Sequence, residues 1–146
     1  MTGVQTCALP ILWAWTGRAE FERAARRMAD LLGGQAQQMP QAYAQALIAL
    51  DEWLGPRREI VLAGSADDPD VLQMRRIMET RFLPRTEVVA RPADPAEAKA
   101  LEALVPWTAG RVPASGKASA YICESQVCGL PVTEVETLKR AVEAWR

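Results

Sequence analysis

Two Asp-Pro pairs, each placed after a short run of apolar residues, constrain the fold of this chain more than any other feature. Residues 59–63 (Glu-Ile-Val-Leu-Ala) precede Asp68-Pro69, and residues 87–90 (Glu-Val-Val-Ala) precede Asp94-Pro95. An aspartate followed by proline is a typical helix start, because the carboxylate accepts from free backbone N–H groups and proline fits the first helical turn. Short β-branched runs between such starts are typical of buried strands. The pattern predicts strands alternating with helices.

A third strand and a closing helix extend this pattern to the end of the chain. Residues 118–123 form another short apolar run, and Thr133 with Glu136 has the spacing of a capping box before the last helix. The order is then β-α-β-α-β-α, which favours right-handed crossovers and parallel strands. We therefore predict an α/β fold class, with a small, three-stranded, mostly parallel sheet over residues 57–146. Its central strand should be covered on both faces.

Residues 12–56 predict a helical hairpin, preceded by the end of another helix at residues 12–15. Apolar residues recur at helical spacing up to Leu32, where Gly33-Gly34 is expected to end the first helix. A second helix is expected to begin at Pro40 and to end at Gly55-Pro56. Its apolar stripe comprises Tyr43, Leu47, Leu50 and Leu54. Two such helices must bury their stripes against another element.

Residues 1–11 (MTGVQTCALPI) have neither helical periodicity nor a cap. They resemble the translation of a common sequencing-library adapter, with which all eleven positions agree if a GTG start codon is read as Met. We predict that this segment is an artefact without a structural role and that it should be excluded from fold reasoning. Cys7 then leaves the cysteine count, and the native sequence is expected to begin at Leu12 inside a longer reading frame.

Composition excludes several classes of function. The chain has 17 basic and 18 acidic residues and a net charge of −1, which gives no electrostatic basis for binding nucleic acid. It contains no histidine, so Ser-His-Asp, Cys-His and His-metal mechanisms cannot operate within it. No apolar stretch approaches the roughly 20 residues that span a bilayer, and no basic residue precedes Arg18 as a secretory signal would require. We expect a cytoplasmic protein with no membrane or nucleic-acid partner.

Cys123 and Cys128 are the candidate redox residues. Their Cys-x4-Cys spacing differs from the two-residue spacing of thioredoxin-like motifs, and two thiolates supply half of a zinc site. Three interpretations stay open: a small buried hydrophobe at Cys123, a disulfide or redox pair, and a metal site. A disulfide would require α-carbons about 4.4 to 6.8 Å apart.

Three other features favour structural roles. The turn of residues 64–69 has one glycine, two carboxylates and no lysine, so a helix cap explains it better than a phosphate loop. The same cap explains Asp67, Asp68 and Asp70 without a metal. Trp107 could line a ligand surface, but more often such a residue anchors a loop on the core. No cofactor, metal site or catalytic residue is predicted.

The carboxyl-terminal half resembles a known family. The residues that carry the resemblance are 60–64 (Ile-Val-Leu-Ala-Gly), 82–84 (Phe-Leu-Pro), 120–123 (Ala-Tyr-Ile-Cys), Cys128 and Pro131. They are similar to the tail of thioredoxin-domain-containing proteins of the spermatogenesis-associated, YyaL type. Residues 12–54 resemble the last helical hairpins of that family, including the Thr16-Gly17 turn.

The resemblance implies a much longer parent with an amino-terminal thioredoxin-like domain and an (α/α)6 toroid similar to six-hairpin glycosidases. Residues 12–56 would be the end of that toroid, and residues 57–146 a small carboxyl-terminal lobe. We expect a non-catalytic structural fragment, not an enzyme as an isolated chain, whose partner is the remainder of the parent; the parent's chemistry would be redox or carbohydrate related. The alternatives are a small redox module using Cys123 and Cys128, and a ligand-binding α/β domain.

Overall fold

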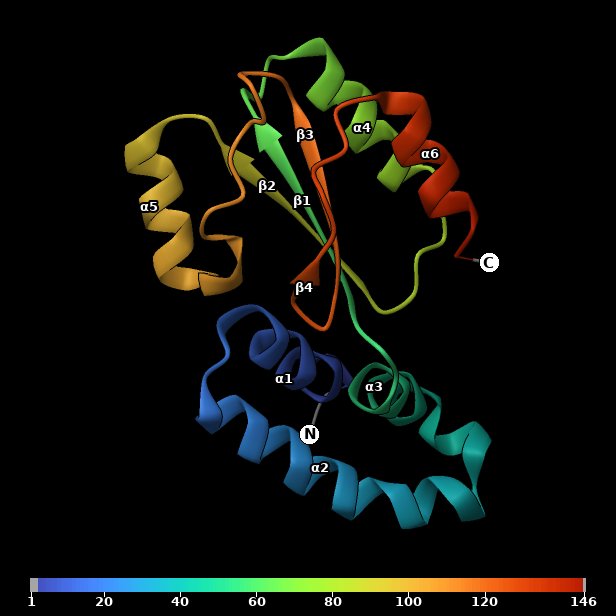
Figure 1. Cartoon of the computed structure of the whole chain (residues 1–146). Helices are drawn as coiled ribbons and strands as arrows, with labels where there is room; N and C mark the ends of the chain where they lie inside the picture. Colours follow the sequence, from blue (N-terminus) through green and yellow to red (C-terminus); the bar gives the residue numbers. More distant parts are fainter. Residues whose placement is uncertain (1–2, 146) are drawn as a thin grey trace. The chain divides into compact units, whose positions relative to one another are not determined.

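The computed structural model describes residues 3–145, which divide into two compact units, one ending at Gly55 and the other beginning at Pro56 (Figure 1). This division falls at the boundary between the predicted helical hairpin (residues 12–56) and the predicted sheet region (residues 57–146). Helices form the first unit, and a sheet with helices forms the second.

The first unit has three α-helices. They are α1 (Gly3–Thr16), α2 (Ala19–Gln38) and α3 (Ala44–Leu54), with a 3-10 turn η1 (Pro40–Tyr43) between the last two. The helix end predicted at residues 12–15 belongs to α1, which packs against both helices of the hairpin, α2 and α3. Residues 3–11 form the first part of α1. The adapter origin of this segment concerns its codons and stays a prediction, and Met1 and Thr2 lie outside the described residues.

Small side chains allow these helices to approach one another. Ala25 and Met28 of α2 and Ala46 and Ala49 of α3 are buried, and the Trp13 and Trp53 rings lie 4.8 Å apart between their centroids. Helix α2 does not end at Gly33-Gly34 as predicted. Neither glycine adopts the left-handed conformation that ends a helix, so the backbone hydrogen bonds continue to Gln38.

The second unit alternates strands and helices. Its elements are β1 (Arg58–Gly64), α4 (Pro69–Glu79), β2 (Thr86–Pro92), α5 (Pro95–Leu104), η2 (Pro106–Thr108), β3 (Ser119–Glu124), β4 (Val127–Cys128) and α6 (Val135–Glu143). Both predicted Asp-Pro starts are confirmed: the Asp68 carboxylate accepts from the Asp70 N–H, and the Asp94 carboxylate accepts from two N–H groups.

The last helix starts differently from the prediction. Its N-cap is Glu134, without a side-chain capping bond, so the predicted Thr133 cap is wrong. Val132 exchanges two backbone hydrogen bonds of 2.8 Å with Ala120, which holds the chain extended beside β3. The backbone at Glu134 is still extended, and the helix begins one residue later.

The sheet is four-stranded and mixed, in the order β2-β1-β3-β4. Strands β1 and β2 are parallel as predicted, but β3 runs antiparallel to β1, and β4 is antiparallel to β3. The expectation of three mostly parallel strands is therefore corrected in both strand number and direction. The cause is the segment between η2 and β3, which returns along the sheet before β3 begins (Figure 1).

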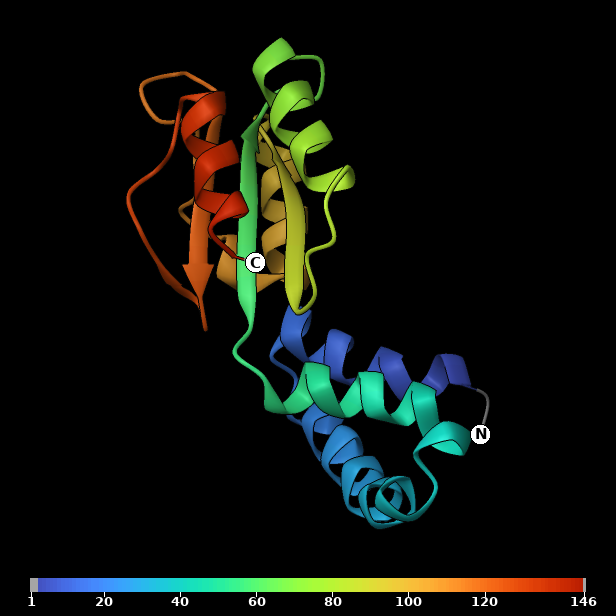
Figure 2. The ribbon, with the colours of Figure 1, turned by 90° about the vertical axis from the view of Figure 1, so that its right-hand side faces the viewer.

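Helices cover both faces of the sheet. Helices α4 and α6 lie on one face and α5 on the other (Figure 2). Ile60 and Leu62 of β1 pack with Met74 of α4 and Leu138 of α6 in the core of the first face. From Glu59 onward every residue of β1 is buried, which confirms that the central strand is covered on both sides. Among residues 3–145 no helix has the length and apolar character needed to span a bilayer.

Candidate functional site

The two predicted redox cysteines meet on the β3–β4 hairpin. Glu124 pairs with Val127, and Cys123 pairs with Cys128. The two-residue turn consists of Ser125 and Gln126, whose φ angles of 49° and 67° are both left-handed, as a type I′ hairpin turn requires. A two-residue turn places residues i and i+5 directly opposite each other, which explains the Cys-x4-Cys spacing.

A disulfide joins Cys123 and Cys128. Their α-carbons are 3.9 Å apart, below the usual range of about 4.4–6.8 Å. The neighbouring pair is joined by the Gly129 N–H to Ile122 C=O bond, so the cysteines occupy a non-hydrogen-bonded position, where opposing strands lie closest. Of the three interpretations the structure contains the disulfide, at an α-carbon separation shorter than the expected range. Cys123, at 2% exposure, is also the buried small side chain expected at the end of a strand.

The two sulfurs have different surroundings. Cys128 is half-buried, and its Sγ lies 3.1 Å from Nη2 of Arg111. The Arg111 guanidinium also donates to the Ala109 carbonyl at 2.7 Å. The Tyr121 hydroxyl donates to the carbonyl of Val112 at 2.6 Å, which ties this loop to β3. The structure thus fixes a permanent cation beside the accessible sulfur.

A buried glutamate is the cross-strand partner of the other cysteine. Glu59 of β1 is 2% exposed and is the direct register partner of Cys123 on β3. Its Oε2 accepts the backbone N–H of Gln126, the second turn residue, at 3.0 Å. Burial raises the pKa of Glu59, while the Gln126 hydrogen bond and the charge of Arg57 oppose the rise and the Glu124 carboxylate adds to it.

Register extends this arrangement into a row across the sheet. Glu87, Glu59, Cys123 and Cys128 are successive partners on β2, β1, β3 and β4. Side chains of residues paired in this way point to the same face, which here is the face opposite Ile60 and Leu62. The row ends at the accessible sulfur.

The remaining sequence candidates have structural roles. Asp68 caps α4, as expected, and Trp107 is buried in η2, as a loop anchor should be. No cluster of three or more Cys, Asp or Glu residues among the described residues could hold a metal ion. Residues 64–66 and 90–94 line a pocket of about 250 Å³ at the carboxyl ends of β1 and β2, but two aspartate-capped helix starts flank it.

Sequence reasoning missed Arg111 and Glu59. Arg111 lies in a loop, and nothing in its sequence context connects it with Cys128. Glu59 did carry a signal, since it is a charged residue inside an otherwise apolar predicted strand. An ionisable residue at a buried strand position deserves inspection as a site candidate.

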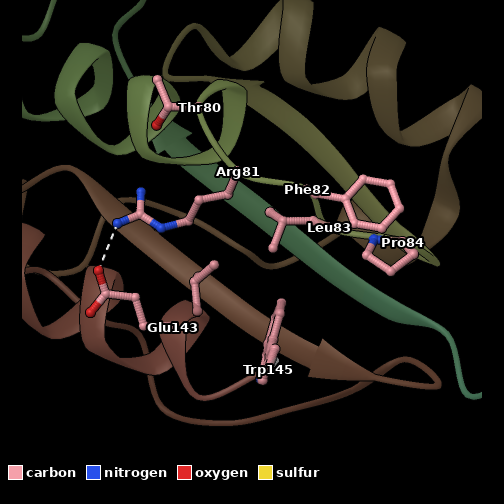
Figure 3. A pocket seen from close by; sticks show the side chains of 8 residues that line it. Thr80, Arg81, Phe82, Leu83, Pro84, Glu143 and Trp145 are labelled. Atoms are coloured by element: carbon pink, nitrogen blue, oxygen red, sulfur yellow. Dashed lines mark hydrogen bonds and ion pairs between the residues drawn. The ribbon is translucent and has the colours of Figure 1, made fainter.

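A second hollow lies on the other side of the α/β unit. It has a volume of about 540 Å³, and its wall joins the segment after α4 to the end of α6 (Figure 3). Arg81 and Glu143 form a 2.9 Å ion pair at one end, and Phe82, Pro84 and Trp145 lie toward the other. The one hydroxyl in its lining, that of Thr80, donates to the Arg76 carbonyl at 2.8 Å, and its ionic groups Arg81 and Glu143 pair with each other.

Comparison with models of protein families, with curated proteins and with solved structures finds no match to this chain. The family resemblance therefore stays an expectation, and the functional argument depends on the geometry of the site.

Proposed function

We propose that the α/β unit carries out thiol–disulfide exchange at Cys123 and Cys128. The observation that carries this proposal is the sulfur of the half-buried residue Cys128, bonded to Cys123 and 3.1 Å from the Arg111 guanidinium. A thiolate is the reactive form of cysteine, and an adjacent cation stabilises it both as nucleophile and as leaving group.

The exchange involves two electrons and two thiols. A thiolate from a small-molecule or protein thiol attacks Sγ of Cys128, the Cys123–Cys128 bond breaks, and Cys123 leaves as a thiolate that takes up a proton. A second thiolate then attacks the outer sulfur of this mixed disulfide and releases Cys128 as a thiolate beside Arg111. The protein disulfide is reduced, and the two external thiols are oxidised to a disulfide. The reverse sequence reduces an external disulfide.

The surface beside Cys128 fits a polypeptide substrate. Val127 and Leu130 flank the cysteine on the outer edge of the sheet and are 77% and 89% exposed. Val112, in the loop that carries Arg111, is exposed as well. Exposed apolar side chains along this edge favour contact with an extended polypeptide over a highly charged small molecule.

The first test is a redox titration. The chain with Cys7→Ser is equilibrated in glutathione buffers of graded ratio, and its thiols are counted by alkylation and mass spectrometry. We expect a reversible dithiol–disulfide transition within the range that thiol–disulfide proteins occupy, roughly −120 to −270 mV. A bond that stays fully oxidised in the most reducing of these buffers would refute the proposal.

The second test isolates Arg111. In reduced protein, Arg111→Ala should slow the reaction of Cys128 with a disulfide reagent at neutral pH by about tenfold, because the charge that favours its thiolate is lost. Arg111→Lys keeps the charge and should retain most of the rate. Equal rates in all three proteins would show that Arg111 does not act on Cys128.

A second proposal concerns the helical unit, which we infer to be a scaffold element of a larger parent protein. Its apolar stripe is open to solvent at Leu31, Leu47 and Leu54, which are 70%, 40% and 77% exposed. An uncovered stripe of this kind supports an interface with helices supplied from outside the described residues, as the expected toroid would supply.

A dye that binds apolar surface tests the scaffold proposal. Leu31→Lys and Leu54→Lys should lower the fluorescence of bound anilinonaphthalene sulfonate without loss of helical circular dichroism. Gln37→Lys, at an exposed polar position of α2, is the matched control. No dye binding by the unmodified chain would count against an uncovered interface.

A further inference from the structure

The exchange reaction needs a proton acceptor for Cys123, and neither Cys128 nor Arg111 supplies one. The buried Glu59 is the candidate for this role. Cys123 must lose a proton before it can attack, and it must gain one after it leaves. Arg111 lies at the other sulfur and cannot accept a proton. Cys123 is 2% exposed, so solvent has little access to its sulfur. The reaction needs a proton acceptor on the buried side of the disulfide.

Glu59 is positioned on that side by two independent constraints. Register pairs it directly with Cys123 across β1 and β3, and side chains of such pairs have Cβ atoms about 4.5–5.5 Å apart. The Gln126 N–H binds Oε2, which holds the carboxyl group under the turn that connects the two cysteines. The second oxygen, Oε1, can act as an acceptor without breaking this bond.

We propose that Glu59 is the proton acceptor for the Cys123 thiol when that thiol attacks a mixed disulfide on Cys128. The proton moves from Sγ of Cys123 to the Glu59 carboxylate as Sγ of Cys123 bonds to Sγ of Cys128. The external thiolate leaves with the electron pair of the broken bond. In the reverse direction neutral Glu59 returns the proton to the departing Cys123 thiolate. This inference depends on the proposed exchange function.

The charges around Glu59 suit this role. Arg57 lies just before β1, Glu87 is the partner of Glu59 on β2, and Glu124 lies on β3. Arg111 lies beside the far sulfur. Burial raises the pKa of Glu59, which makes its carboxylate a better proton acceptor than one of ordinary pKa.

The alternative role for Glu59 is purely structural, since its carboxylate holds the Gln126 N–H of a left-handed turn. Glu59→Gln separates the two roles. The amide oxygen can still accept from Gln126, whereas the amide cannot accept a proton from a thiol. Glu134→Gln, at an exposed position without a capping bond, is the matched control.

The experiment follows the two phases of the reaction of reduced Cys7→Ser protein with dithiobis(nitrobenzoate). The first phase releases one thionitrobenzoate as Cys128 forms the mixed disulfide, and the second releases another as Cys123 displaces it. In Glu59→Gln the second phase should slow by about 10- to 100-fold at neutral pH and then rise with hydroxide concentration up to about pH 9. The first phase should be unchanged, Glu134→Gln should match the unmodified protein in both phases, and Glu59→Asp should recover part of the rate.

The outcomes separate this inference from the proposed function. Two normal phases with the same pH profile in Glu59→Gln would overturn the role of Glu59 and leave the exchange function standing. Absence of thionitrobenzoate release from the reduced, unmodified protein would overturn both.

A measurement on the unmodified chain covers the case in which Glu59→Gln does not fold. The ¹³C resonance of the Glu59 carboxyl should titrate at different pH in the reduced and oxidised proteins, because only the reduced form has a Cys123 thiol to share its proton. Identical titration curves in the two forms would overturn the inference.

Discussion

Reduction of the Cys123–Cys128 bond should leave the α/β unit folded and only moderately less stable. The disulfide closes a short loop, with a sequence separation of 5 residues. Loop-closure entropy for such a ring corresponds to about 2 kcal/mol of the free energy of unfolding. The backbone bonds that hold this edge do not need the disulfide, since Val132 and Ala120 exchange two of them and Gly129 donates to Ile122.

Hydrogen exchange measures this effect within the α/β unit alone. Amides of β1 and β3 in the Cys7→Ser chain are compared with and without dithiothreitol, and about 2 kcal/mol corresponds to roughly 30-fold faster exchange through global opening. Cys128→Ser, which cannot form the bond, should not respond to the reductant. Unfolding of the unit on reduction, or a loss above about 5 kcal/mol, would refute the reasoning and make a working dithiol form untenable.

Three further perturbations test the fold and the buried carboxyl group. Leu138→Ala, at a fully buried core position, should lower the free energy of unfolding by about 2–5 kcal/mol in urea titrations, and a loss below about 1 kcal/mol would show that α6 does not seal the core. Asp94→Ala removes the carboxylate oxygen that accepts from two N–H groups at the start of α5 and should cost about 1 kcal/mol, whereas Asp94→Asn should cost less; equal losses would argue against the cap. Because the pKa of Glu59 is raised on folding, the native state holds its proton more tightly, so stability should fall as pH rises above about 4.5 through the folded pKa. In Glu59→Gln that part of the decline should be missing from urea titrations across this range, and an unchanged decline would contradict the raised pKa.

Local signals in the sequence were sufficient for much of the fold. The Asp68 and Asp94 caps, the strand at residues 59–63 and the change of unit at Pro56 depend on interactions within a few residues, and the structure has all of them. The direction of β3 depends instead on how far the chain travels between η2 and β3, and loop composition does not encode that distance. The two-residue strand β4 is too short to show periodicity.

The candidate site was predictable in part. The cysteines were visible as a pair, and their five-residue separation agrees with a tight hairpin once a two-residue turn is assumed. Ser125 and Gln126 do not predict that turn, because neither is the glycine or asparagine that left-handed positions favour. Arg111 reaches Cys128 from 17 residues away in the chain, a contact that only the tertiary structure creates.

The outer rim of the sheet beside Cys128 has an irregular backbone. Ala120 would face Pro131 in a regular ladder but is bridged to Val132, so one extra residue is accommodated between Gly129 and Val132. Pro131 has no N–H with which to bind a further strand, and a bulge bends the edge so that a straight strand cannot pair along it. This edge is consequently unsuited to the addition of further strands, the step by which fibrils grow. The dithiol form, with Leu130 exposed, should therefore not aggregate through this edge even at high protein concentration.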